Sequence, residues 1–147
     1  PFLRRPDPMP PVQFYGQLDP AVFVLRLVPG MRADIIPLLA PHYRALVVES
    51  FGVGGLPGGE HGEMYARLQD WCTSGRLAVF TTQVPHEGCD LAVYEVGRSV
   101  KELPGVLEAK DMTPEAVAVK LMWALGQTTD RAEAMRLFTT PVEWDIV

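Results

Sequence analysis

Residues 105–126 read GVLEAKDMTPEAVAVKLMWALG, and this stretch predicts a strand, a turn and a helix in direct succession. The apolar run at 106–107 ends a buried strand. Thr113 can cap the helix through its hydroxyl group, and Pro114 suits the first helical position, where no backbone N–H is needed. Apolar residues then recur at helical spacing, and Gly126 is expected to end the helix. A strand and a helix so closely joined should pack on one core.

Three apolar runs upstream of this stretch predict further strands, at 21–28, 45–49 and 77–82. Helical patterns separate these runs, and the regular alternation predicts an α/β fold with a mainly parallel four-stranded sheet flanked by helices. The first helical pattern is short, at 32–43, and the second runs through Met64, Leu68 and Trp71 and ends at Gly75. A third follows Val93, Val96, Val100 and Leu103. The last begins at the capping-box pair Asp130 and Glu133 and contains Met135 and Phe138.

The composition fits one globular domain. The chain has 147 residues and a net charge of -5, which argues against a general nucleic-acid or anionic-membrane surface. No apolar run approaches the ~20 residues of a membrane helix. The two cysteines, Cys72 and Cys89, are too few for a disulfide framework, so a reducing, cytoplasmic location is predicted.

Residues 1–20 are interpreted as a Pro-rich interdomain linker. Five prolines occur in the first eleven residues, a composition that excludes a helix or a central strand. Because a linker joins two bodies, the chain is expected to be the downstream part of a longer protein, with residues 21–147 forming its domain.

Ligands of parallel sheets bind outside the carboxyl ends of the strands, so the loops 50–60, 82–90 and 110–113 should share one functional rim. The first loop is rich in glycine, but a dinucleotide fingerprint fails because position 57 is Pro, and a phosphate loop fails because no Lys-Ser or Lys-Thr pair follows. Two interpretations remain: the glycines provide a tight turn, or they hold a small ligand.

A second rim loop contains His86, Glu87, Cys89 and Asp90, with His61 across the rim. A thiol nucleophile or a metal site would use such residues. Neighbours in one loop rarely converge, however, so a solvated loop is favoured and no metal or cofactor is predicted. Asp111 is interpreted as a cap of the helix that begins near 113 or as a carboxylate on the rim, and the cap is the favoured role.

Three segments carry a family resemblance: VVESFGVGGLP, GRLAVFTTQVPHEG, and YEVGRSVKELPGVLEAKDMTPEAVAVKLMWALGQ. In this order they resemble the C-terminal domain of the bacterial and cytoplasmic, type I L-asparaginases, from about residue 22 to residue 140. The resemblance implies a three-layer, Rossmann-like domain. It also implies an amidohydrolase that converts asparagine to aspartate and ammonia, without a cofactor.

The catalytic threonines of that family belong to T-G-G-T and H-G-T-D-T motifs of a larger N-terminal domain, and neither motif occurs in these residues. No catalytic residue is therefore assigned here, and this domain alone should not hydrolyse amides. The implied partners are the N-terminal catalytic domain, further copies in a homo-oligomer, and L-asparagine.

The resemblance also suggests a ligand-binding or domain-boundary rim, formed by Ser50, Gly52, Gly54, Gly55, Thr82 and Gln83. Where allosteric type I members carry Arg, Asn and Cys, this chain has Glu49, Gly55 and Val84, so cooperative activation should be weak or built differently. An Asn that the periplasmic enzymes lend to a neighbouring active site falls at Pro57. His86 or Glu87 is the hypothetical replacement for the Glu they also lend.

The runner-up interpretation is a self-contained regulatory domain that binds a small amino acid on the same rim. The coding sequence upstream of Pro1 would discriminate the two, because only an asparaginase requires a threonine-motif domain there. A Cys89 hydrolase is a third hypothesis, which thiol alkylation would test.

Overall fold

The computed structural model describes residues 11–52, 54–58, 62–84, 88–93, 95–142 and 145–146. In these residues strands and helices alternate up to α4, and α5 follows. The elements are β1 (Val22–Arg26), α1 (Ile35–Leu39), β2 (Ala45–Ser50), α2 (Glu63–Thr73), β3 (Leu77–Thr82), α3 (Glu95–Lys101), β4 (Val106–Glu108), α4 (Pro114–Gln127) and α5 (Arg131–Thr139).

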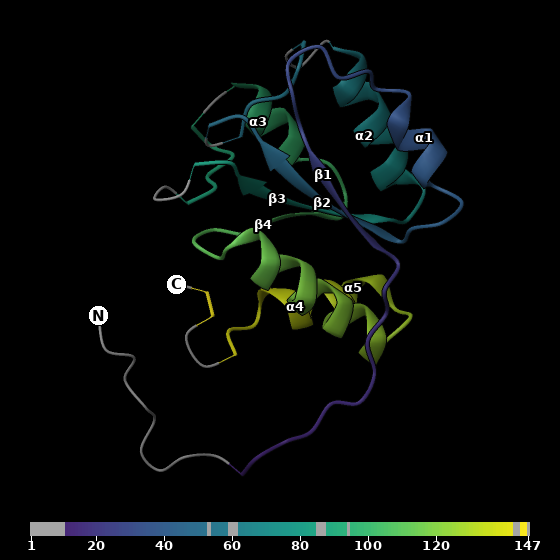
Figure 1. The fold of residues 1–147 in the computed structure, drawn as a ribbon, viewed down its shortest axis with the longest axis vertical. Helices are drawn as coiled ribbons and strands as arrows, with labels where there is room; N and C mark the ends of the chain where they lie inside the picture. Colours follow the sequence, from purple (N-terminus) through teal and green to yellow (C-terminus); the bar gives the residue numbers. More distant parts are fainter. Residues whose placement is uncertain are drawn as a thin grey trace.

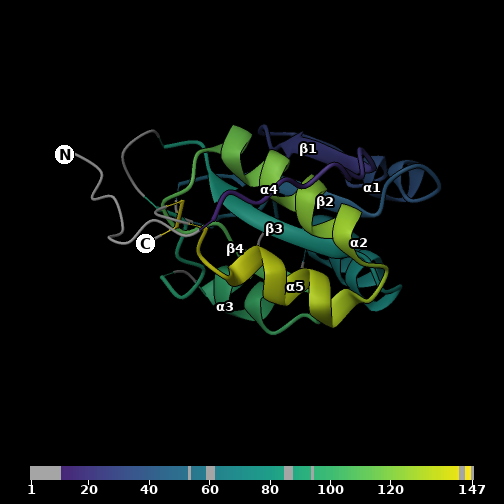
Figure 2. The same cartoon turned by 90° about the horizontal axis from the view of Figure 1, so that it is seen from below.

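The four strands form one sheet in the order β1-β2-β3-β4, and every neighbouring pair is parallel. Helices α1, α2 and α3 cover one face, and α4 and α5 cover the other (Figures 1 and 2). The predicted three-layer α/β fold is confirmed.

Both faces of the two central strands are buried, as the continuous apolar runs predict. Alternate residues of β2 point to opposite cores: Leu46 and Val48 pack with α1 and α2, whereas Ala45 and Val47 pack with α4 and α5. Strand β3 repeats the pattern, and all six residues of each strand are buried. The sheet is thus a rigid central layer that positions the loops at its two edges.

The starts predicted for the last two helices are confirmed. Thr113 Oγ1 accepts a hydrogen bond from the N–H of Ala116 at 3.4 Å, and Pro114 is the first residue of α4. Asp130 Oδ1 accepts from the N–H of Glu133 at 2.7 Å at the start of α5. The second half of the predicted capping box is not formed, because the Glu133 carboxylate pairs with Arg136 and the N–H of Asp130 donates to Thr128 Oγ1.

The helix predicted through residues 93–103 is shorter than its apolar spacing suggests. Helix α3 begins at Glu95 and ends at Lys101, so Val93 and Leu103 lie outside it. Asp90 explains the late start, because its side chain accepts from the N–H of Ala92 and its carbonyl accepts from the N–H of Val93. This Asx-type turn holds Val93 outside the helix, where it is exposed.

The prediction that Gly126 ends α4 is wrong, because the helix continues to Gln127 and Thr128 is the first extended residue. Gly126 instead gives space to the chain before β1. A Cβ at this position would lie 2.6 Å from the carbonyl oxygen of Gln17 and 2.9 Å from the Cα of Leu18. A glycine is needed here because of this close contact.

The described part of the predicted linker, residues 11–20, contains no helix or strand and is fixed to α4 by several contacts. The N–H of Asp19 donates to the carbonyl of Met122 at 2.9 Å, and the Tyr15 and Trp123 rings meet edge to face at 5.3 Å. Figure 1 shows this segment in purple, leading past α4 into β1. The remaining predicted linker residues, 1–10, lie outside the described part of the chain.

Replacing Gly126 by Ala should detach the segment 11–18 from α4. Alanine favours the helix by about 1 kcal/mol, so global stability should change little, but its Cβ cannot coexist with the Gln17 carbonyl. We expect amide hydrogen exchange at Asp19, whose N–H donates to the Met122 carbonyl, to rise about tenfold, as the loss of about 1.4 kcal/mol of local packing would produce. Gly16→Ala is the matched control, because a Cβ at Gly16 meets no atom within 4 Å. Equal exchange in the two variants would contradict the role assigned to Gly126.

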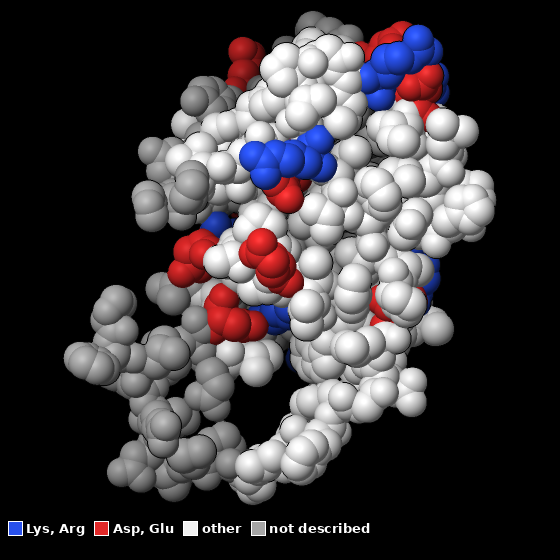
Figure 3. Space-filling view, viewed as in Figure 1, with Lys and Arg blue, Asp and Glu red and all other residues white. Residues whose placement is uncertain are grey.

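The surface agrees with the charge composition. On the face shown in Figure 3, basic side chains lie beside acidic ones and do not form a continuous basic surface. Among the described residues, no helix is both long and apolar enough to cross a membrane.

Candidate functional site

The loops at the carboxyl edge of the sheet meet as predicted, which creates one rim. The loop after β3 is joined to the loop after β4 by a bridge in which the N–H of Cys89 donates to the carbonyl of Lys110 at 2.8 Å. The glycine turn after β2 packs on the same loop, since a Cβ on Gly54 would lie 2.9 Å from the Leu91 side chain. Lys110 has a φ of +52°, an unusual backbone conformation for a residue other than Gly, Asn or Asp.

A pocket of about 300 Å³ opens at this rim, between the ends of β1, β2 and β3 and the start of α4. Most of the residues that line it have polar or charged side chains. The lining is formed by Arg26, Glu49, Thr81, Thr82, Gln83, Val84, Asp111, Met112, Thr113, Pro114 and Glu115. The described lining thus contains one cation and three carboxylates. The helix-cap role favoured for Asp111 is wrong, because Thr113 is the N-cap of α4, and Asp111 lies in the lining of the pocket.

Arg26 is the rim residue that sequence reasoning missed. It is the last residue of β1 and lies opposite Glu49 in the β1–β2 register, with its Nη1 atom 3.2 Å from Glu49 Oε2. The Glu49 side chain is largely buried and that of Arg26 is exposed. The register of the two strands was the missing signal. Arg26 thus places a positive charge beside Glu49, the carboxylate that stands where the family resemblance implies an arginine.

The predicted polar rim residues use their side chains to hold the strand ends together. Ser50 Oγ donates to the carbonyl of Thr81 at 2.9 Å, and the Thr82 hydroxyl donates to the carbonyl of Gly52. Gln83 Nε2 donates to two carbonyls, those of Leu27 at 2.7 Å and Glu49 at 2.9 Å. Gln83 therefore ties the segment after β1 to the end of β2, and Thr82 fixes the glycine turn.

The glycine turn has the geometry expected of a structural turn. Gly52 and Gly54 have φ values of +49° and +147°, which favour glycine. The N–H groups of Gly54 and Gly55 both donate to the carbonyl of Phe51, at 3.2 and 2.8 Å. Backbone donors that a phosphate cradle would need are thus used inside the turn, and these glycines do not line the pocket.

The residues predicted to contact a neighbouring active site, His86 and Glu87, lie outside the part of the chain that the structure describes, as does His61. Within that part, no three His, Cys, Asp or Glu residues gather in a way that could hold a metal ion.

The Cys89 hydrolase hypothesis is contradicted by the environment of the thiol. Cys89 is buried, and burial raises its pKa to about 12, with the charges of Glu108 and Asp90 acting in the same direction. Burial also raises the pKa of Cys72 to about 11, against an opposing effect of the Arg131 charge. Both thiols stay protonated near neutral pH, so neither is an activated nucleophile.

These thiols should make the domain sensitive to alkaline pH. The ordinary thiol pKa is 9.0, so above pH 9 the unfolded chain loses protons that the folded chain keeps. The free energy of unfolding should therefore fall with rising pH, by at most about 1.4 kcal/mol per pH unit for each thiol. Urea unfolding at pH 8 to 11 would measure the slope, and Cys89→Ala should reduce it. An unchanged slope in that variant would contradict the assignment.

The parallel sheet, the two helical layers and the pocket at the carboxyl edge define a three-layer α/β domain with a small polar site. The chain belongs to the Glutaminase/Asparaginase C-terminal domain family, whose model matches residues 21–138. This confirms the family resemblance seen in the sequence.

Relatives with this domain include two kinds of protein. The L-asparaginase of Thermococcus kodakarensis is 37% identical over 133 residues, which are 90% of this chain and 40% of the relative. A subunit of the Glutamyl-tRNA(Gln) amidotransferase of Metallosphaera sedula is 36% identical over 140 residues, which are 95% of this chain and 30% of that relative. The chain thus spans less than half the length of either relative.

Solved structures agree with the sequence match. The thermostable L-asparaginase from Thermococcus kodakarensis superposes with a TM-score of 0.81 and 36% identity, over 89% of this chain and 39% of that chain. L-asparaginase I from Vibrio cholerae gives a TM-score of 0.76 and 25% identity, over 88% of this chain and 38% of that chain.

Proposed function

We propose that this chain is the C-terminal domain of an L-asparaginase, which converts L-asparagine and water to L-aspartate and ammonia. The observation that carries the proposal is the match to the Thermococcus kodakarensis enzyme, in sequence and in structure, over about nine-tenths of this chain. In this proposal the catalytic threonines belong to an N-terminal domain, and residues 1–20 lead from that domain. Assembly into a homo-oligomer and a cytoplasmic location are part of the proposal.

The rim pocket is the part of this domain that would meet a ligand or the catalytic domain. Its volume of about 300 Å³ suits a small molecule. Arg26 could pair with the carboxylate of an amino acid, and Glu49 lies 3.2 Å from Arg26, where it could accept from the ammonium group. The other rim residues then support the pocket by fixing the strand ends. They are Ser50, Gly52, Gly54, Gly55, Thr82 and Gln83.

A second candidate is a subunit of a Glutamyl-tRNA(Gln) amidotransferase, because one such protein is 36% identical over 95% of this chain. The same domain would then support the action of an amidotransferase together with other subunits. The two candidates share the fold and the rim, so a functional assay must separate them.

Two chimeras provide that assay. In the first, residues 21–138 replace the matching segment of the Thermococcus kodakarensis L-asparaginase, and ammonia release from L-asparagine is measured. In the second, the same residues replace the matching segment of the Metallosphaera sedula amidotransferase protein, and amidotransferase activity is measured after assembly with its partners. Each host with its own domain rejoined through the same junctions is the control.

Activity of the first chimera, with no ammonia release by this chain alone, is the expected result. Activity of the second chimera only would favour the amidotransferase. Inactivity of both chimeras, with active controls, would contradict both candidates. A nuclear magnetic resonance titration of this chain with L-asparagine would test the rim separately. Saturable shifts are expected at Arg26, Thr82 and Gln83, and their absence would contradict a ligand site at the rim.

A further inference from the structure

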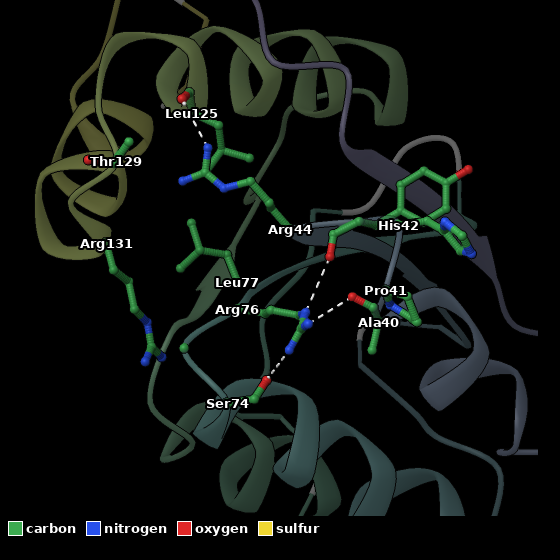
Figure 4. Close-up of a pocket in the computed structure, with 12 residues that line it drawn as sticks. Ala40, Pro41, His42, Arg44, Ser74, Arg76, Leu77, Leu125, Thr129 and Arg131 are labelled. Carbon is green, nitrogen blue, oxygen red and sulfur yellow. Dashed lines mark hydrogen bonds between the residues drawn. The ribbon is translucent and has the colours of Figure 1, made fainter.

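A second pocket, of about 340 Å³, lies at the amino edge of the sheet, at the opposite ends of the strands from the rim. It is formed by the segments that enter β2 and β3 and by the junction of α4 and α5 (Figure 4). Three arginines, Arg44, Arg76 and Arg131, line it together with His42, and none of the described residues that line it is acidic. In a chain with a net charge of -5, this concentration of positive charge requires an explanation.

Two of the arginines are anchored by the protein. Arg44 Nη1 lies 2.6 Å from Asp19 Oδ2. Arg76 donates to the carbonyls of Ala40 and Tyr43, at 2.7 and 3.3 Å, and to Ser74 Oγ at 2.6 Å. Its guanidinium also lies over the Trp71 ring. These contacts, several of which are drawn in Figure 4, fix both side chains at the wall of the pocket.

Arg131 is held differently. Its Nε and Nη2 atoms are buried, and they have no hydrogen-bond partner among the residues that the structure describes. Its guanidinium lies against the backbone of Gly105, where a Cβ would occupy the same space. Buried guanidinium donors are nearly always paired, because an unpaired one loses its hydration without compensation. The glycine therefore makes room for a charged group whose acceptor is not supplied by the described residues.

We infer that this pocket binds a small oxyanion, a carboxylate or a phosphate group, and that the Arg131 guanidinium turns from Gly105 into the pocket to become its principal donor. A guanidinium presents parallel N–H groups that match the oxygens of either anion. Arg76 adds positive charge from the opposite wall. The charge of Arg44 is balanced by Asp19, and none of the described lining residues is acidic. The site is independent of the rim and of the function proposed above.

The test is a titration of this chain with inorganic phosphate, L-aspartate or acetate, at an ionic strength held constant with sodium chloride. Amide shifts should saturate at Gly75, Thr129 and Arg131. With phosphate and acetate they should stay small at the rim residues Thr82 and Gln83, whereas L-aspartate also carries the amino-acid groups proposed to bind at the rim. Saturation by phosphate alone would assign a phosphate site, and saturation by L-aspartate or acetate alone would assign a carboxylate site. Both results support the inference, and saturation by none of the three overturns it.

Variants on one helix provide the controls. Arg131→Gln should weaken binding about tenfold or more, because it removes a charge-assisted, two-pronged contact. Arg131→Lys keeps the charge without the fork, so its affinity should be intermediate. Arg136→Gln removes the same charge from an exposed position of α5 and should leave binding unchanged. Equal binding by Arg131→Gln and the wild type would overturn the inference, and the wild-type titration remains decisive if that variant fails to fold.

Discussion

Replacing Gln83 by Leu is expected to lower the free energy of unfolding by about 2–3 kcal/mol. The Gln83 amide donates to the carbonyls of Leu27 and Glu49, which belong to two different strand ends. Leu27 is fully buried, so its carbonyl would lose the amide donor where water cannot replace it. The Glu49 carbonyl keeps the N–H of Leu27 as a donor. Urea unfolding followed by circular dichroism would measure the change.

Gln127→Leu is the matched control. Its side-chain amide also donates to two backbone carbonyls, those of Gln17 and Trp123, at 2.9 and 3.0 Å, but at an exposed place. Because water can replace the lost donors there, we expect a change below about 1 kcal/mol. Similar losses in the two variants would show that burial of the rim does not strengthen the Gln83 contacts, and would contradict its role as the tie between the strand ends.

Replacing Lys120 by Met should lower the free energy of unfolding by about 2–3 kcal/mol. Lys120 lies on α4 and is buried, with its Nζ atom 2.8 Å from Asp145 and 2.9 Å from the carbonyl of Thr140. The methionine would fill most of the volume but leave the carboxylate and the carbonyl without the ammonium group. Residues 145–146 should then leave the α4–α5 core, in which Ile146 is buried. Thermal unfolding and hydrogen exchange would measure both effects.

Lys101→Met is the control for the ion pair. Lys101 Nζ also lies 2.8 Å from a carboxylate, that of Glu108, but about half of its side chain is exposed. Solvent screening should limit the loss to less than about 1 kcal/mol. A Lys120→Met variant as stable as the wild type would contradict this prediction. It would mean that apolar packing compensates for the lost Lys120–Asp145 ion pair and that residues 145–146 do not depend on that pair.

The rim changes the interpretation of the missing allosteric residues. The family resemblance implies that Glu49 stands where allosteric members tend to have a positive charge, which predicts a site that repels an amino-acid carboxylate. Arg26 lies beside Glu49 in the structure and offers that charge from the adjacent strand. A ligand would thus meet a paired cation and anion, and Arg26→Gln should abolish the shifts that L-asparagine causes at the rim.

The sequence by itself determined the layers of the fold. Continuous apolar runs such as 45–49 and 77–82 identify strands that are buried on both faces, and local chemistry at Thr113, Pro114 and Asp130 fixes where helices begin. These signals act over a few residues, so they can be recognised without knowing the neighbours in space. The family model matches residues 21–138, a range that includes these strands and helix starts.

Only the tertiary structure decided which residues meet across elements. Gly126 looked like a helix end because glycine usually ends helices, yet it is needed for the passage of Gln17, more than a hundred residues away in the chain. The strand register pairs Arg26 with Glu49, and the packing of α5 brings Arg131 to the arginines that precede β2 and β3. Such contacts depend on the relative placement of whole elements, which no local pattern of side chains specifies.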